Sequence, residues 1–241
     1  MRRIPWLVCV AFAGCQSFSA NDLAALPGST TALTRTLPAP LRLTRSREDP
    51  LLPQATQALE KGDHAQACEL LREYAQRHPE SKNARVLYAE VLAKLGRSCE
   101  ASVEFEKVVA RAQEDKTLDL ALLVHCHGRL LDLAEEDGDM FHIHLHRGLG
   151  LYWLAQQKRT SQEPDDAVPT EAILWKSVME LTLARSLQAA EARPNWYLHL
   201  AWRQLGQTAP AQRWLAEANE CSPFTYLTPR ERGDLTLRIG Q

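Results

Sequence analysis

Apolar residues recur along the second quarter of the chain at the spacing of amphipathic helices. One stripe runs from 65 to 77 and two more run through 82–113, with apolar residues three and four positions apart. Gly62 and Gly96 precede two of the stripes, where the first helix of a hairpin would end in a left-handed residue. The pattern therefore predicts two helical hairpins, residues 51–78 and 82–113.

A spacing of 34 residues relates these two hairpins to each other, and the spacing of positions within each hairpin returns in a third one near the C-terminus. The 34-residue spacing separates Gly62 from Gly96, and the residues that follow them recur with it. The repeated positions are Ala67 and Ala101, Leu71 and Phe105, and then Gly206, Ala211, Leu215, Ala218 and Pro223. The small alanine lets the second helix approach the first, and the large apolar residue fills the interface. In this period and these positions the chain resembles the tetratricopeptide-repeat (TPR) family.

The resemblance implies an all-α fold, a TPR-like α-solenoid of about four helical hairpins over residues 51–223. The repeat is irregular in the middle, because the next predicted turn, at Gly138, follows Gly96 by 42 residues. There we expect a hairpin with a longer first helix, then a polar loop and one long helix over 170–192. The last hairpin returns to the regular spacing.

The C-terminal residues, 224–241, contain a helix start signal. Thr228 and Glu231 stand at the positions of a capping box, and Pro229 occupies the first helical position. Because terminal repeats need a polar outer cover, we expect a short capping helix there that faces solvent.

For function, the TPR resemblance implies a groove that holds an extended peptide or a partner helix. In the family, positions of the first helices line this groove. The glycine register places these residues of the chain there: Asn83, Glu90, Lys94, Arg193, Trp196 and Arg203. Trp196, Arg203 and Lys94 are the strongest candidates, because exposed aromatic and charged groups dominate binding energy at interfaces. We expect a non-enzymatic adaptor for a protein or peptide partner, with a purely structural protein as an alternative.

The N-terminus predicts export from a bacterial cytoplasm. Two arginines precede an apolar run that is too short to span a bilayer, which takes roughly 20 residues, and small residues follow. Cys15 after Ala-Gly resembles the acylated cysteine of bacterial lipoproteins. We expect a signal peptide at 1–14, lipidation at Cys15 and a flexible tether at 15–50, which would anchor the protein to a membrane of the cell envelope. Cleavage near Ala20 would instead leave a soluble periplasmic or secreted protein.

Charge and cysteine content exclude some classes of protein. The formal net charge is −2, and no basic stripe suited to nucleic acid is present. Four cysteines besides Cys15 form no Cys-x-x-Cys motif: Cys68, Cys99, Cys126 and Cys221. Their spacing leaves open whether they pair, and we expect free thiols in the core.

One alternative function is metal binding at His142 and His146. They lie four residues apart and so share one face of the predicted helix. His125 or His127 from the preceding helix could complete a metal site, and Asp139 could add a carboxylate. The favoured interpretation is that these are surface or capping histidines, so no metal or other cofactor is expected.

Motifs for enzymatic chemistry are missing from the sequence. Gly148 and Gly150 lack the third glycine and the lysine of a phosphate loop, and we expect them to allow two helices to approach closely. No serine stands in a Gly-x-Ser-x-Gly motif. Trp175 is expected in the core of the long helix.

Overall fold

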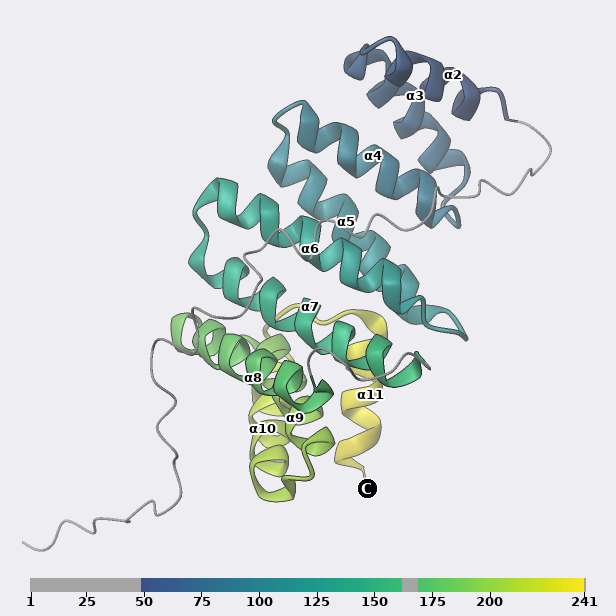
Figure 1. Ribbon diagram of the computed structural model, residues 1–241. Helices are drawn as coiled ribbons and strands as arrows, with labels where there is room; N and C mark the ends of the chain where they lie inside the picture. The colour runs from purple at the N-terminus through teal and green to yellow at the C-terminus, as the bar shows by residue number, and fades with distance from the viewer. Residues whose placement is uncertain (1–48, 162–168, 241) are drawn as a thin grey trace, which may run out of the picture. The chain divides into compact units, whose positions relative to one another are not determined.

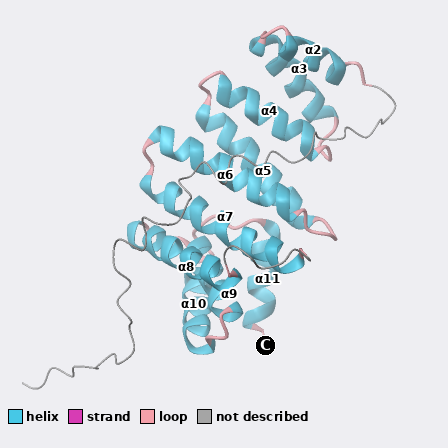
Figure 2. Cartoon of the chain, viewed as in Figure 1, coloured by secondary structure: helices cyan, strands magenta, loops and turns pink. Residues whose placement is uncertain are grey.

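The computed structural model describes residues 49–161 and 169–240, which lie within one compact unit. Those residues form helices and no strands (Figures 1 and 2), which confirms the all-α prediction. The helices in chain order are α2 (Leu51–Glu60), α3 (His64–Arg77), α4 (Lys82–Lys94), α5 (Ser98–Glu114), α6 (Leu120–Asp137), α7 (Met140–Thr160), α8 (Thr170–Leu187), α9 (Ala192–Gln204), α10 (Thr208–Cys221) and α11 (Pro229–Ile239). The predicted signal peptide, Cys15 and all but the last two residues of the tether lie outside the described residues.

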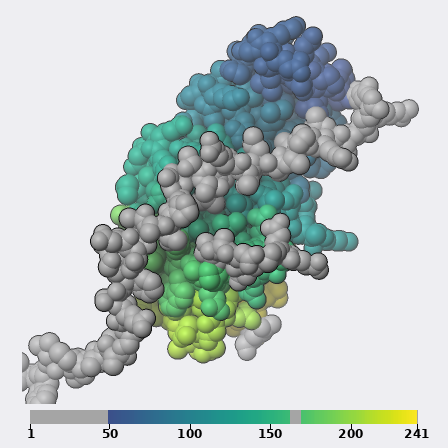
Figure 3. Space-filling view, viewed as in Figure 1, coloured from purple at the N-terminus to yellow at the C-terminus, as the bar shows by residue number. Residues whose placement is uncertain are grey.

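Four hairpins form the TPR-like α-solenoid: α2–α3, α4–α5, α6–α7 and α9–α10. They follow one another as bands of colour in the space-filling view (Figure 3). Two described helices, α8 and α11, stand outside these hairpins, so the helix count exceeds that of four hairpins.

A left-handed glycine ends the first helix of each hairpin. Gly62, Gly96, Gly138 and Gly206 have φ angles of 77°, 71°, 70° and 74°, which residues with a Cβ rarely adopt. In each turn the amide that follows the glycine donates to a carbonyl five residues earlier, over 2.9–3.0 Å. The four predicted turn positions are therefore confirmed, including the irregular one at Gly138.

The long helix expected over 170–192 is shorter in the structure, because α8 ends at Leu187 and α9 begins at Ala192. Pro194 explains the division. In α9 it lies in the first turn, where a missing N–H leaves no helical hydrogen bond unmade. In one continuous helix its ring would clash with the preceding turn and a hydrogen bond would be lost.

Helix α8 stands alone between two hairpins. After it, a first helix therefore occupies the place that a second helix would take in the regular alternation. Upstream of α8, first helices contact each other: Arg129 Nε on α6 donates to Glu90 Oε1 on α4 over 2.9 Å. The first helix of the last hairpin, α9, contacts second helices instead. Arg193 donates to Glu106 on α5 over 2.9 Å, and Gln204 Nε2 donates to Tyr152 Oη on α7 over 3.1 Å.

The packing of α7 against α8 depends on Gly148. A Cβ at this position would lie 2.7 Å from Leu181 Cγ and 3.2 Å from the Leu181 backbone nitrogen. Ser177 Oγ also donates to the Gly148 carbonyl over 2.7 Å. The predicted close approach of two helices is confirmed at Gly148, whereas Gly150 has room for a Cβ, since its nearest neighbour would be 3.6 Å away.

The C-terminal helix α11 begins at the predicted capping box. The Glu231 amide donates to Thr228 Oγ1 over 3.2 Å, and the Thr228 amide donates to Glu231 Oε2 over 2.9 Å. The expectation that this helix faces solvent is only partly right. Glu231 and Leu235 are 2% and 1% exposed, because this face of α11 packs into the helical body and contacts α5 and α10.

The four cysteines of the described residues are free thiols. Cys68 and Cys126 are buried as expected, but Cys99 is exposed and Cys221 is half-buried, so the core assignment is wrong for Cys99. Within the described ranges, no helix combines the length and the apolar character needed to cross a bilayer.

Candidate functional site

The candidate groove residues on α4 lie beside α6. Asn83 and Glu90 are partly exposed and Lys94 is exposed. Glu90 Oε1 accepts from Arg129 Nε over 2.9 Å and lies 3.5 Å from His125 Nε2. Burial alone would raise the pKa of Glu90, but the hydrogen bond from His125 and the charge of Arg129 hold it below its usual value. Among these three residues, Lys94 is the most accessible to a partner.

The candidate groove residues on α9 have a different environment. Arg203 is exposed, but Arg193 and Trp196 are 4% and 2% exposed. The helix α11 contributes to this burial: its Arg238 guanidinium lies 5.8 Å from the centre of the Trp196 ring, and its Glu231 pairs with Arg193. The expectation that Trp196 is exposed is therefore wrong. Since α9 contacts α5 and α7 rather than α4 and α6, the structure does not bring the two sets together.

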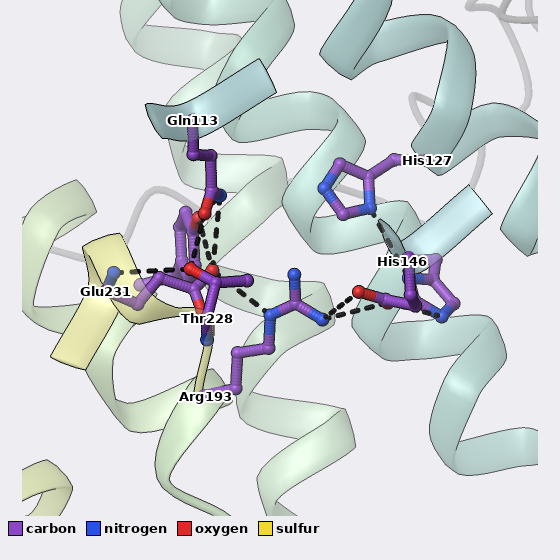
Figure 4. Close-up of polar contacts among 8 residues, drawn as sticks. Gln113, His127, His146, Arg193, Thr228 and Glu231 are labelled. Atoms are coloured by element: carbon purple, nitrogen blue, oxygen red, sulfur yellow. Dashed lines mark hydrogen bonds and ion pairs between the residues drawn. The ribbon is translucent and has the colours of Figure 1, made fainter. Parts of the chain in front are cut away.

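A buried polar network holds α11 against α5 and α9, and Glu231 is its centre (Figure 4). Glu231 Oε1 accepts from Tyr197 Oη over 2.8 Å, from Arg193 Nε over 3.2 Å and from Gln113 Nε2 over 3.3 Å. Thr228 Oγ1 donates to Gln113 Oε1 over 2.5 Å. Burial and the carboxylate of Glu231 raise the pKa of Tyr197 well above its ordinary value, so this hydroxyl stays a donor.

Arg193 extends this network toward α5 and α7. Its Nη1 donates to both carboxylate oxygens of Glu106, over 2.9 and 3.0 Å. Burial lowers the pKa of Arg193, but Glu106 and Glu231 together raise it above the usual value. One positive side chain is thus shared by two carboxylates from different helices, as a buried charge requires.

Two buried histidines complete the network. His127 Nδ1 on α6 lies 3.4 Å from His146 Nδ1 on α7, and His146 Nε2 lies 4.0 Å from Glu106. Burial lowers the pKa of both rings well below the ordinary value, and the charge of Arg193 adds to this effect. His127 Nε2 and Arg193 Nη2 have no hydrogen-bond partner among the described residues. Neutral histidines are therefore part of the interior.

The two candidate metal ligands, His142 and His146, have different surroundings. His142 is half-exposed, and its Nδ1 lies 2.7 Å from Asp139, the residue that caps the start of α7. His146 instead stacks against His142 and His127, with ring centres 5.7 and 5.6 Å away. Across residues 49–161 and 169–240, no three His, Cys, Asp or Glu side chains are placed to hold a metal ion.

Cavities flank the C-terminal segment on two sides. One, of about 570 Å³, lies between the C-terminal ends of α5 and α7 and the helices α9 and α11. Its walls include Trp196 and Leu200. The other, of about 530 Å³, is lined by α5, α6, α7 and Tyr226, and it contains His142 and His146. No feature of the sequence indicates that residues after 221 separate two cavities.

An apolar ridge on α8 is exposed. Its members recur every fourth residue, at Trp175, Met179, Leu183 and Leu187, and their exposed fractions are 47%, 56%, 45% and 51%. Trp175 meets the half-buried Trp202 of α9 edge to face, with ring centres 5.0 Å apart. The expectation that Trp175 lies in the core is wrong, because Leu174, Val178 and Leu181 form the inner face of α8.

Comparisons with known proteins identify the repeat. A family model described as tetratricopeptide repeat matches residues 58–123. A crystal structure of MamA is 11% identical, with a TM-score of 0.36 over 70% of this chain and 94% of that chain. MamA 41-end from Desulfovibrio magneticus RS-1 is 15% identical, with a TM-score of 0.30 over 72% and 93%. No curated protein matches the chain.

Proposed function

We propose that this chain, which carries tetratricopeptide repeats over residues 58–123, is a non-enzymatic scaffold that binds a partner protein on the exported side of a bacterial membrane. The exposed ridge on α8 carries the proposal. Large apolar side chains scattered singly on a surface need no explanation, but four in one row on one helix mark an interaction surface. Trp175 in that row belongs to the residue type most enriched at binding hot spots.

The spacing of the ridge indicates what kind of surface the partner presents. A row of side chains at every fourth position is one of the two ridges by which helices interlock, and it fits the groove between rows on another helix. The occupant we propose is therefore an apolar face of a partner's helix. We keep the proposed role of polar contacts for the accessible groove candidates, which are Asn83, Glu90, Lys94 and Arg203. Arg193 and Trp196 instead hold α11 in place.

The experiment that tests this function is capture of partners from cells of the source organism by the full-length protein after mild crosslinking. A Trp175→Ser, Met179→Ser variant removes half of the ridge at positions that are about half exposed, so folding should persist. The matched control is Leu237→Ser, at a residue of α11 that is 68% exposed. We expect a discrete partner with the unmodified protein and the control, and its loss in the ridge variant. Equal capture by all three would contradict the role of the ridge.

The location rests on the sequence features at the N-terminus, the apolar run and Cys15. Membrane anchoring through a single modified cysteine would hold the repeats near the bilayer by means of the tether. The test is incorporation of labelled palmitate followed by membrane fractionation. Cys15→Ala should abolish the label and release the protein, whereas Cys99→Ala should retain both. Label that persists in Cys15→Ala would refute the anchor and leave the partner-binding function to be judged by the capture experiment.

A further inference from the structure

Three arginines from three different helices line one small cavity. Arg159 comes from the end of α7, Arg203 from α9 and Arg238 from α11. The cavity has a volume of about 390 Å³, and its remaining walls are Tyr152, Leu200 and Gln204. Among the described residues, no carboxylate lines it. Half of the residues around this hollow are thus permanently positive.

No carboxylate of the described residues pairs with these arginines. Arg159 Nη1 donates to the neutral amide oxygen of Gln204 over 3.0 Å, and Arg238 lies over the Trp196 ring. The nearby Asp234 already accepts from Arg230 over 3.0 Å. This contrasts with many arginines elsewhere in the chain, such as Arg85, which pairs with Glu104 over 2.7 Å. Like charges gathered without a counter-charge repel each other, so their convergence favours an anion between them.

Two of the three arginines are held in place before any ligand arrives. Gln204 fixes Arg159, and Gln204 itself is held by Gln156 and Tyr152, over 2.7 and 3.1 Å. The Trp196 ring supports Arg238 by a cation–π contact. Guanidinium groups held in this way bind carboxylates through paired hydrogen bonds at a reduced entropic cost.

A hollow with both polar and apolar walls continues from the arginine cavity, and its carboxylates, Asp115, Glu231 and Asp234, already pair with Lys82, Arg193 and Arg230. The 570 Å³ cavity shares Tyr152, Leu200 and Arg238 with it, and its walls also include Leu118 and Trp196. A small inorganic anion would leave this second space unfilled. A chain in which carboxylates alternate with apolar side chains would fill both spaces, with acidic groups on the arginines and apolar groups against Leu118 and Leu200.

From this juxtaposition we propose that Arg159, Arg203 and Arg238 form the anchor of a binding site for an acidic peptide segment of a partner protein, with the adjoining cavity receiving its apolar side chains. The site goes beyond the proposed ridge contact, because α8 contributes no residue to either cavity. It also gives α11 a function, since Arg238 reaches the cavity only while Glu231 holds that helix in place.

The test is calorimetric titration of the full-length protein with an acetylated, amidated octapeptide that alternates glutamate and leucine. Binding should weaken by at least about tenfold in Arg203→Gln and again in Arg238→Gln, because each change removes a charge-assisted hydrogen-bond donor. Arg213→Gln, at an exposed arginine of α10 outside both cavities, is the matched control and should bind normally. Raising the salt concentration from 50 to 500 mM should weaken binding further.

Two further probes decide between ligands. The same octapeptide with glutamine in place of glutamate should not bind, and inorganic phosphate should bind far more weakly than the acidic peptide. Equal binding of the acidic peptide to Arg203→Gln, Arg238→Gln and the unmodified protein would overturn the proposal, as would phosphate binding as tight as that of the peptide. Either failure would leave the ridge untouched, because the ridge variant is tested by partner capture and not by this peptide.

Discussion

Arg193 on α9 and Glu231 on α11 form an ion pair inside the protein, with Nε and Oε1 3.2 Å apart and side chains that are 5% and 3% exposed. The pair joins the last helix of the chain to a position that the repeat register predicts for partner binding. Together with Arg238, which lies over Trp196, it shows that the chain's own C-terminal helix contacts two of the three predicted groove residues on α9.

Removing Glu231 should loosen the C-terminal helix. Glu231→Ala leaves Arg193 buried with one carboxylate instead of two and breaks the hydrogen bond from Tyr197, so we expect a loss of about 3–5 kcal/mol in the free energy of unfolding. The exposed Glu220 of α10 provides the control, and Glu220→Ala should change stability by less than about 0.5 kcal/mol. Urea denaturation measures both values. A Glu231→Ala variant as stable as the control would show that the network does not hold α11.

Gly148 and Gly150 should respond in opposite ways to alanine. Gly148→Ala places a methyl group against the side chain and backbone of Leu181, so α7 and α8 must separate, and we expect a destabilisation of about 1–3 kcal/mol. Gly150→Ala meets only an ordinary contact at 3.6 Å and should be neutral or stabilising by up to about 1 kcal/mol, because alanine favours the helix. Thermal unfolding of both variants gives the comparison. Equal shifts of the melting temperature in the two variants would contradict this packing of α7 against α8.

The buried histidines should make the fold sensitive to acid. In the unfolded chain His127 and His146 titrate near a pKa of about 6.5, while their folded pKa values lie well below this. The unfolded state thus binds more protons at low pH. Their contribution to stability is full above about pH 6.5 and falls below it, by up to about 1.4 kcal/mol per pH unit for each histidine.

Urea denaturation at pH 7.5 and pH 5.0 measures this loss. A His127→Gln, His146→Gln variant should lose less stability between the two pH values than the unmodified protein. His142→Gln, at a half-exposed position on the same helix as His146, is the control and should retain most of the dependence. The same pH dependence in the double variant and the unmodified protein would rule out these two groups as its source.

Thiol reactivity should follow burial. Cys99 is exposed and should react with a maleimide in the folded protein within minutes. Cys68 and Cys126 are buried, and burial raises the pKa of both thiols, so they should react only after unfolding. Mass spectrometry after brief labelling at pH 7.5 reads out each site. Rapid native labelling of Cys126 would contradict the packing of α6.

Periodic sequence features predicted the regular part of this fold. Glycines located all four hairpin turns, including the one at Gly138 outside the regular spacing, since each left-handed turn favours this residue. The capping box located the start of α11 for a similar local reason. Local signals of this kind depend on a few neighbouring residues, which a single sequence displays.

The long-range contacts could not be predicted in this way. Nothing near Gln113 or Glu106 in the sequence indicates that they meet residues 118 and 87 positions away. The burial of Trp196 follows from α11 folding back, and the exposure of Trp175 follows from α8 standing alone between hairpins. In both cases the helix that carries the side chain was predicted, but the exposure of the side chain depends on elements that are distant in the sequence.

Site-specific photocrosslinking in cells tests whether the α8 ridge binds a partner protein. A photoreactive amino acid is introduced in place of Met179 on the ridge or, as the control, in place of the exposed Gln212 on α10. We expect a discrete crosslinked partner from position 179 and none from position 212. The same adducts from both positions, or no protein adduct from position 179, would contradict partner binding at the ridge.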